Sequence, residues 1–148
     1  MITVDWQIKD FGELSIKELH DIIQLREKVF VVEQDCPYLD VDGQDPAAYH
    51  VIGIHDKIMA TARIFPPDST GKVVIGRICN DNKYRGSGVG KKLVEQCLIF
   101  CKKSWPQATI KISAQCYLIR FYESFGFKKI GEEYLEDGIP HITMTIAS

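Results

Sequence analysis

Residues 84–93 read YRGSGVGKKL, in which an arginine precedes three glycines spaced two apart and then two lysines. The segment joins a predicted strand, residues 72–80, to a predicted helix. Several unpaired backbone N–H groups and the positive end of a helix dipole would therefore face one point. Glycine also lets a ligand approach the backbone closely. We predict an anion site at this loop, suited to a pyrophosphate.

Two other phosphate-loop patterns do not fit the spacing of these glycines. The dinucleotide pattern GxGxxG, begun at Gly86, would need a glycine where Lys91 stands. The Walker pattern GxxxxGK[ST] would need a glycine at Arg85 and a serine or threonine at Lys92. What remains is the pattern RxxGxG, over residues 85–90.

Length, composition and charge restrict the class of protein. The chain has 148 residues, 45% of them hydrophobic, and a net charge of −2, which suits a single domain over residues 1–148. No apolar run approaches the ~20 residues of a membrane span, and the N-terminus does not resemble a signal segment, so we predict a cytoplasmic protein. The balanced charge gives no support to nucleic-acid binding. A homodimer is left open.

The cysteines of the chain are predicted to be packing residues. They are odd in number and scattered without a CxxC pair, which argues against a disulfide framework and against a zinc ribbon. Two of them have metal-ligand spacing on one helix face, but no histidine accompanies them, so packing is favoured and no metal is expected. The five are Cys36, Cys79, Cys97, Cys101 and Cys116.

Periodicity predicts the elements of the N-terminal half. Ile2–Ile8 alternates apolar and polar residues, as a half-buried strand does. A capping box begins at Ser15 and predicts a helix that runs to about Val32. Residues 33–48 are rich in Pro, Gly and Asp, so they predict a long loop with a short helical turn. A hairpin of two apolar, β-prone strands follows, at residues 49–54 and 58–65.

Local sequence patterns also predict the elements of the second half of the chain. Residues 72–80 and 109–115 predict strands, and two final strands flank Glu136-Asp137-Gly138, where Asp-Gly favours a tight turn. Residues 118–124 predict a short helix. A longer helix after the glycines carries an apolar stripe. The resulting order is β, α, loop, β, β, β, α, β, α, β, β, which predicts an α/β (α+β) fold with a central mixed sheet flanked by helices. The stripe consists of Val89, Leu93, Cys97 and Cys101, with Val94 and Leu98 beside them.

With this loop in place, the sequence resembles the GNAT superfamily of acyl-CoA-dependent N-acetyltransferases. Residues 121–127, FYESFGF, are similar to a second GNAT motif of Phe or Leu, Tyr-Glu and then Gly-Phe. Three stretches resemble the ElaA-type branch, namely LREKVFVVEQDCPYLDVDGQD, AQCYLIRFYESFGF and EDGIPHITM. The resemblance implies the GNAT acyl-CoA N-acyltransferase fold and acetyl-CoA as cosubstrate. It does not name the acceptor amine.

The same resemblance implies a set of cofactor residues. Backbone amides from Arg85 to Lys91 would hold the pyrophosphate, and free peptide groups of a splayed strand around Ile78 would bond the pantetheine arm and polarise the thioester. Gly76 in that strand indicates a bulge or a close backbone approach, or else packing under an aromatic ring. Gln115 stands where the family often has Asn. The full set is Ile78, Cys79, Asn80, Arg85, Gly86, Ser87, Gly88, Val89, Gly90, Lys91 and Gln115.

Proton transfer needs an acid and a base. Tyr122 matches the position of the acid in many GNAT enzymes, and a phenol of pKa about 10 can protonate a leaving thiolate of pKa near 8.5. The alternative is a tyrosine that packs in the core. An alkylamine is protonated at neutral pH, so a base must act. Glu33, His50 and His141 are the candidates, and a relay through water is the alternative.

Charge suggests the kind of acceptor. Six acidic residues and no Lys or Arg lie between Val29 and Asp56, which predicts a cationic amine, unless the run is only solvated surface. A non-catalytic acyl-CoA-binding module is the alternative function. Arg26-x-x-x-Phe30 before an acidic loop is also similar to acyl-homoserine-lactone synthases, which share the fold and are longer. The six acidic residues are Glu33, Asp35, Asp40, Asp42, Asp45 and Asp56.

Overall fold

Seven strands form one mixed sheet in the computed structural model, which describes residues 2–147. The strand order is β1-β2-β3-β4-β5-β7-β6, and every neighbouring pair is antiparallel except β4 with β5. The predicted domain, residues 1–148, includes Met1 and Ser148, which lie outside the described residues. The strands are β1 (Asp5–Asp10), β2 (Tyr49–His55), β3 (Lys57–Phe65), β4 (Lys72–Asn80), β5 (Thr109–Gln115), β6 (Lys128–Glu136) and β7 (Ile139–Ala147).

Within residues 2–147, three α-helices cover the sheet. Ser15 caps the first of them with the predicted capping box, because its hydroxyl accepts from the N–H of Glu18 while the Glu18 carboxylate accepts from the N–H of Ser15. The helices are α1 (Ile16–Arg26), α2 (Val89–Ser104) and α3 (Ile119–Glu123). Shorter segments are the π-helix η2 (Glu27–Glu33) and the 3₁₀ turns η1 (Phe11–Glu13), η3 (Asp45–Ala47), η4 (Asn82–Tyr84) and η5 (Cys116–Leu118).

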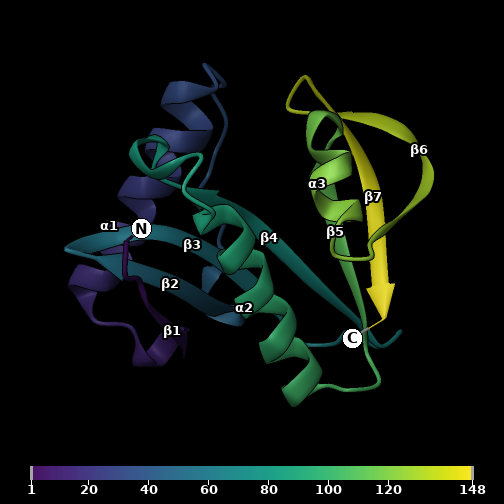
Figure 1. Ribbon diagram of the computed structural model, residues 1–148, viewed down its shortest axis with the longest axis horizontal. Coiled ribbons are helices and arrows are strands. Elements are labelled where there is room, and N and C mark those ends of the chain that lie inside the picture. Colours follow the sequence, from purple (N-terminus) through teal and green to yellow (C-terminus); the bar gives the residue numbers. More distant parts are fainter. Residues whose placement is uncertain (1, 148) are drawn as a thin grey trace.

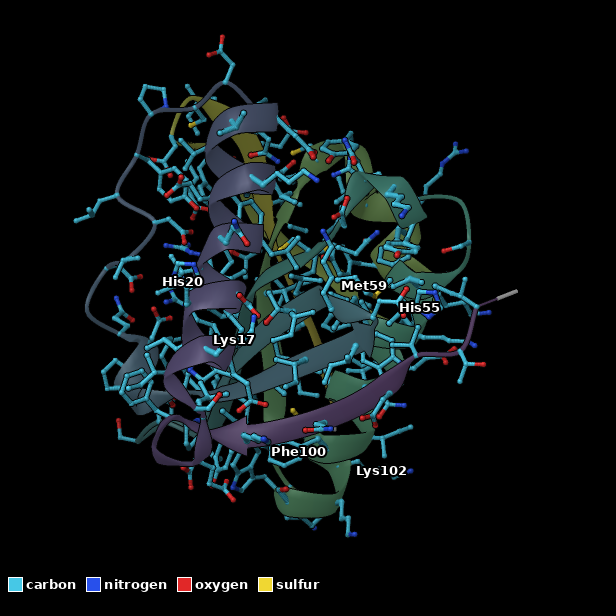
Figure 2. All side chains as sticks on the ribbon, turned by 90° about the vertical axis from the view of Figure 1, so that its left-hand side faces the viewer. Lys17, His20, His55, Met59, Phe100 and Lys102 are labelled. Atoms are coloured by element: carbon cyan, nitrogen blue, oxygen red, sulfur yellow. The ribbon has the colours of Figure 1, made fainter. Side chains whose placement is uncertain are left out.

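Helices α1 and α2 lie on opposite faces of the sheet. Adjacent residues of a strand point to opposite faces, and Ile52 packs with α1 whereas Val51 packs with α2. In Figure 2, Lys17 and His20 mark α1, and Phe100 and Lys102 mark α2. The predicted stripe of α2 is confirmed, since its buried residues are Val89, Leu93, Val94, Cys97 and Cys101.

The predicted order of elements is confirmed, although several boundaries differ. The first strand covers Asp5–Asp10 rather than Ile2–Ile8, although all four predicted apolar residues of its inner face pack against the core. The first helix changes at Glu27 from α to π, so it is not α-helical as far as Val32. The last helix is shorter than predicted because Cys116–Leu118 forms a 3₁₀ turn before it.

The parallel pair β4 and β5 diverges along its length. Its pairing covers only Lys72–Val74 against Thr109–Lys111, and beyond it the two strands separate. Figure 1 shows them together at one end of the sheet and apart at the other, with α2 following β4. The seven-stranded sheet therefore has an opening between Val74 and Asn80 on one side and Lys111 and Gln115 on the other.

Candidate active site

A cavity of about 710 Å³ lies at the opening between β4 and β5. This volume is within the range of small-molecule and cofactor pockets. Its walls come from η2 and the long loop after it (residues 34–48), from the glycine loop, from β4 and β5, from α3 and from the β6–β7 turn. Segments that are far apart in the sequence therefore line one cavity.

Strand β4 carries a bulge at this cavity. Thr61 pairs with Cys79 and Arg63 with Gly76, so two residues of β4, Arg77 and Ile78, oppose a single residue of β3. The bulge predicted from Gly76 is confirmed. Its alternative, packing under an aromatic ring, is wrong, because a Cβ added at Gly76 would meet no heavy atom within 4 Å.

The glycine loop presents free backbone donors at the start of α2. Gly86 and Gly88 have positive φ of +81° and +84°, and a Cβ added to either would meet nothing within 4 Å. Gly88 caps α2 without a side chain, and the first hydrogen bond of the helix runs from the N–H of Lys92 to the Gly88 carbonyl. The N–H groups of Val89 to Lys91 thus have no intrahelical acceptor. They suit the pyrophosphate of an acyl-CoA.

Most of the residues assigned to the cofactor line this cavity. Ser87 and Val89 do not, since the Ser87 hydroxyl donates to the Tyr84 carbonyl and the Val89 side chain is buried in the core. For Val89 only backbone groups are available to a ligand, and the N–H of Ser87 already donates to the Tyr84 carbonyl at 3.3 Å. Those that line the cavity are Ile78, Cys79, Asn80, Arg85, Gly86, Gly88, Gly90, Lys91 and Gln115.

Tyr122 lies on α3 with only 6% of its surface exposed, and it lines the cavity. Its ring makes edge contacts with Phe121 and Phe127, at centroid distances of 5.2 and 5.9 Å. Burial raises the pKa of its hydroxyl above the ordinary value, so the hydroxyl stays protonated well above neutral pH. Within residues 2–147 this hydroxyl forms no hydrogen bond, which leaves it free to meet a ligand.

The three candidate bases are in different surroundings. Glu33 lines the cavity, where its carboxylate forms an ion pair of 2.8 Å with Arg85 of the glycine loop. His141 also lines the cavity, from β7 opposite Gln115. His50 is buried away from it, and its Nε2 contacts the Asp45 carbonyl at 2.9 Å. Burial lowers the pKa of His50, in keeping with a neutral structural side chain.

His141 belongs to a polar cluster on the β5–β7–β6 side of the cavity. Its Nδ1 lies 2.7 Å from the Ile139 carbonyl, which can only accept, so Nδ1 carries the proton. Its Nε2 lies 3.3 Å from the carboxylate of Glu136, and its ring stacks on Tyr134. Ser113 hydrogen-bonds both Tyr134 and Glu136. The Nε2 is therefore the acceptor nitrogen of the ring, and it lies next to a carboxylate.

Most of the acidic run is paired, so few of its carboxylates are free to attract a cationic acceptor. Three of its carboxylates form ion pairs with three arginines, and we call this group the arginine–aspartate cluster. The arginines lower the pKa of Asp42 and Asp45, which keeps both ionised. The cluster consists of Arg26, Arg63 and Arg77 with Asp40, Asp42 and Asp45, at ion-pair distances of 2.6 to 3.4 Å.

Sequence reasoning did not indicate that the long loop and the β6–β7 turn both reach the cavity. Cys36 and Tyr38 reach it from the long loop, and Glu136 and Asp137 reach it from the β6–β7 turn. The Sγ of Cys36 donates to the Asp137 carbonyl at 3.4 Å across 101 residues of chain, so the loop and the turn meet. The Asp-Gly turn was predicted, but no local pattern indicates that it touches the loop.

Two classes of site are absent from the described part of the chain. Within residues 2–147, no helix combines the length and the apolar character that a membrane span needs. In the same residues, no three His, Cys, Asp or Glu side chains come together as a metal site. Cys97 and Cys101 are instead fully buried in the core.

Comparison with known proteins gives consistent matches over nearly the whole chain. Residues 18–148 match the family model of the acetyltransferase (GNAT) domain. The chain is 43% identical over 145 residues to protein ElaA of Escherichia coli K12, covering 95% of each. The crystal structure of E. coli ElaA matches with a TM-score of 0.91, and an acyl-CoA N-acyltransferase from Pseudomonas aeruginosa with 0.93. Each match covers 97% of this chain and 99% of the other, at 41% and 40% identity respectively.

The fold, the glycine loop and the cavity define an acyl-CoA-dependent acyltransferase of the GNAT type. The chain belongs to the GNAT acetyltransferase family, in its ElaA-type branch. Acyl transfer is the general activity that this family supports, with acyl-CoA as donor. The acyl-homoserine-lactone (AHL) synthase LasI, at 15% identity and a TM-score of 0.79, shares the fold alone.

Proposed function

We propose that the protein is an N-acetyltransferase that transfers an acetyl group from acetyl-CoA to a primary amine of a small molecule or peptide, by direct attack. The observation that supports it is a single cavity lined by the glycine loop, by Tyr122 and by the His141–Glu136 pair. Anion-binding amides, a protonated hydroxyl and an acceptor for a proton are what amine acetylation requires. We expect the reaction to take place in the cytoplasm.

Each group has a role in this proposal. Within the run from Arg85 to Lys91, the amides of Gly86 and of Gly88 to Lys91 hold the pyrophosphate, because the N–H groups of Arg85 and Ser87 already donate to backbone carbonyls. Free peptide groups of the bulge, around Ile78, polarise the thioester carbonyl, a contribution of a few kcal/mol for a fixed donor to an oxyanion. Tyr122 protonates the leaving thiolate. Its raised pKa makes it a weaker acid than a free phenol, so the transfer depends on a hydrogen bond formed in the transition state.

His141 is the proposed base. With its Nδ1 proton held by the Ile139 carbonyl, its Nε2 can accept the proton of the incoming ammonium group. The Glu136 carboxylate, 3.3 Å away, then stabilises the imidazolium. Glu33 is the weaker candidate, because its carboxylate is already engaged by Arg85.

A first prediction tests whether acetyl-CoA is the cosubstrate and whether the protein is an enzyme or a binding module. At a free concentration of about 100 times its dissociation constant, acetyl-CoA should raise the free energy of unfolding by roughly 2.7 kcal/mol, and the melting temperature by roughly 5–10 °C. Thermal denaturation with and without acetyl-CoA measures this. Thiol release from acetyl-CoA with a panel of amines then separates an enzyme from a binding module. A shift without thiol release would favour the binding module, and no shift at millimolar acetyl-CoA would contradict both.

A second prediction concerns the acceptor. Since the acidic loop is neutralised, a preference for cationic amines has to come from the carboxylates of the cavity that lack a Lys or Arg partner, Glu136 and Asp137. A polyamine or lysine-like acceptor should be acetylated faster than an acidic amino acid. Glu136→Gln should raise KM for the cationic amine by about 2- to 5-fold, the effect of one half-exposed ion pair, and should also lower kcat because Glu136 stabilises the His141 imidazolium. Equal rates with acidic acceptors would contradict the charge argument.

The control for this prediction is Glu132→Gln. Glu132 lies on the same strand, β6, but does not line the cavity. Its replacement removes one negative charge from the same part of the surface and should leave KM unchanged. A general effect of net charge would instead appear in both variants. Raising the salt concentration should reduce the difference between Glu136→Gln and the wild type, because exposed charges are screened.

A further inference from the structure

Arg77 has a backbone conformation that a side-chain residue adopts only under constraint. Its φ is +49°, and it is one of the two β4 residues in the bulge. A residue with a Cβ pays a conformational penalty in this left-handed region, and such a residue persists where its surroundings hold it. The bulge therefore depends on contacts that Arg77 makes elsewhere.

Those contacts all lead to the long loop. The Nε of Arg77 lies 2.9 Å from Asp40 Oδ1, at an angle that gives an ion pair rather than a hydrogen bond. A second nitrogen donates to the Asp40 carbonyl at 3.1 Å and to Asp42 Oδ2 at 3.4 Å. The guanidinium also lies over the ring of Tyr38, 5.3 Å from its centroid. Every second residue from Tyr38 to Asp42 thus contacts the side chain of Arg77.

The loop is in turn fixed to the rest of the molecule. Arg26 of α1 is 1% exposed, and it binds both Asp40 and Asp45 at 2.9 and 2.8 Å. Arg63 of β3 binds Asp42 at 2.6 Å. The carboxylates that hold Arg77 are therefore held themselves, by side chains from two other elements. A loop fixed in this way can impose a conformation on β4.

Both the β4 bulge and the long loop reach the cavity. Arg77 and Ile78 line it from the bulge, and Tyr38 lines it from the loop. The peptide groups proposed to polarise the thioester belong to the bulge, whereas Cys36 and Tyr38 form the wall next to the β6–β7 turn. A change in the conformation of the loop should therefore alter the position of the peptide groups at Ile78 through the side chain of Arg77.

We propose that Arg77 is a positioning residue, which transmits the order of the long loop to the backbone of the β4 bulge and so aligns the peptide groups that meet the thioester. Its effect on catalysis rests on the proposed function. Its effect on the loop does not, because the contacts of Arg77 with Tyr38, Asp40 and Asp42 exist without any substrate.

The test compares Arg77→Ala, Arg77→Lys and the control Arg120→Ala by steady-state kinetics at a temperature where all are folded. Arg120 is an exposed arginine of α3 that does not line the cavity. Arg77→Ala should lower kcat by about 10²-fold, the cost of a misplacement of about 1 Å at a reacting centre. KM for acetyl-CoA should change less than kcat, since the glycine loop that binds the pyrophosphate is intact. Arg77→Lys keeps the charge and should recover part of kcat.

A structural measurement accompanies the kinetics. Amide hydrogen exchange of residues 34–48 should be faster in Arg77→Ala than in the wild type, with exchange in β2 unchanged. Faster loop exchange together with a loss of kcat supports the proposal. Unchanged loop exchange overturns it, even if no acceptor is found, and in that case the proposed function is not affected. Faster exchange with wild-type kcat also overturns it, because the loop would then not act on the bulge.

Discussion

Tyr122→Phe should lower kcat by about 10²- to 10⁴-fold, the range typical of a lost general acid. The variant keeps the ring, which packs against Phe121 and Phe127, and removes only a hydroxyl that makes no hydrogen bond within residues 2–147. The fold and the binding of acetyl-CoA should therefore survive. Because the missing interaction belongs to the transition state, kcat and kcat/KM should fall together.

The pH dependence of the wild type checks the same assignment. Burial raises the pKa of Tyr122, so its proton is present below the raised pKa and is lost only above it. Across about pH 6 to 10, no decline of kcat should arise from this hydroxyl. Steady-state kinetics of wild type and Tyr122→Phe over that range, with an amine from the panel, measure both effects.

The matched control for this variant is Tyr49→Phe. Tyr49 lies on β2, where its ring packs against Phe100, and it does not line the cavity. Removing its hydroxyl should leave kcat unchanged. If Tyr122→Phe also keeps wild-type kcat over the whole pH range, Tyr122 has no part in the reaction and water becomes the proton source.

Gly88→Val should abolish measurable binding of coenzyme A. Gly88 has a φ of +84° and caps α2, so a branched side chain there would strain the loop and stand where a ligand approaches the N–H groups of α2. A hydrogen bond to a charged group contributes about 1.5–3 kcal/mol. Loss of two such bonds amounts to roughly 3–6 kcal/mol, or about 10²- to 10⁴-fold in the dissociation constant. Isothermal titration calorimetry with coenzyme A measures it.

Gly71→Val separates the loss of binding from the loss of stability. Gly71 has a φ of +77° and equally open surroundings, but it precedes β4 at the far end from the glycine loop and does not line the cavity. Both variants should lose about 1–2 kcal/mol of folding stability from the strained backbone. Only Gly88→Val should lose coenzyme A. Equal binding in the two variants would contradict the anion site.

The elements of the fold could be predicted because each one is specified by its own residues. The alternation of apolar residues, the capping box at Ser15 and the Asp-Gly turn at residue 137 all act within a few residues of chain. The glycine loop was predictable for the same reason, because unpaired N–H groups at a helix start follow from helix geometry alone. The resemblance to GNAT proteins added the ligand expected at that loop, the pyrophosphate of an acyl-CoA.

Boundaries were less predictable where tertiary contacts compete with local preference. The first helix keeps its apolar face as far as Val29, yet its backbone changes to a π-helix at Glu27. That segment leads into Glu33, which pairs with Arg85, and into the long loop held by the arginine–aspartate cluster. Periodicity of apolar residues carries no information on such contacts.

The charge of the long loop shows most clearly what the sequence could not decide. The sequence alone determined that the loop is acidic, that glycines precede α2 and that β4 contains an unusual glycine. Only the tertiary structure decided that Asp40 and Asp42 are neutralised by Arg77, 37 and 35 residues away, and that His141 meets Glu136 beside the opening of the sheet. An ion pair depends on the distance between two side chains in space, and that distance is set by the packing of β3, β4 and α1 around the loop.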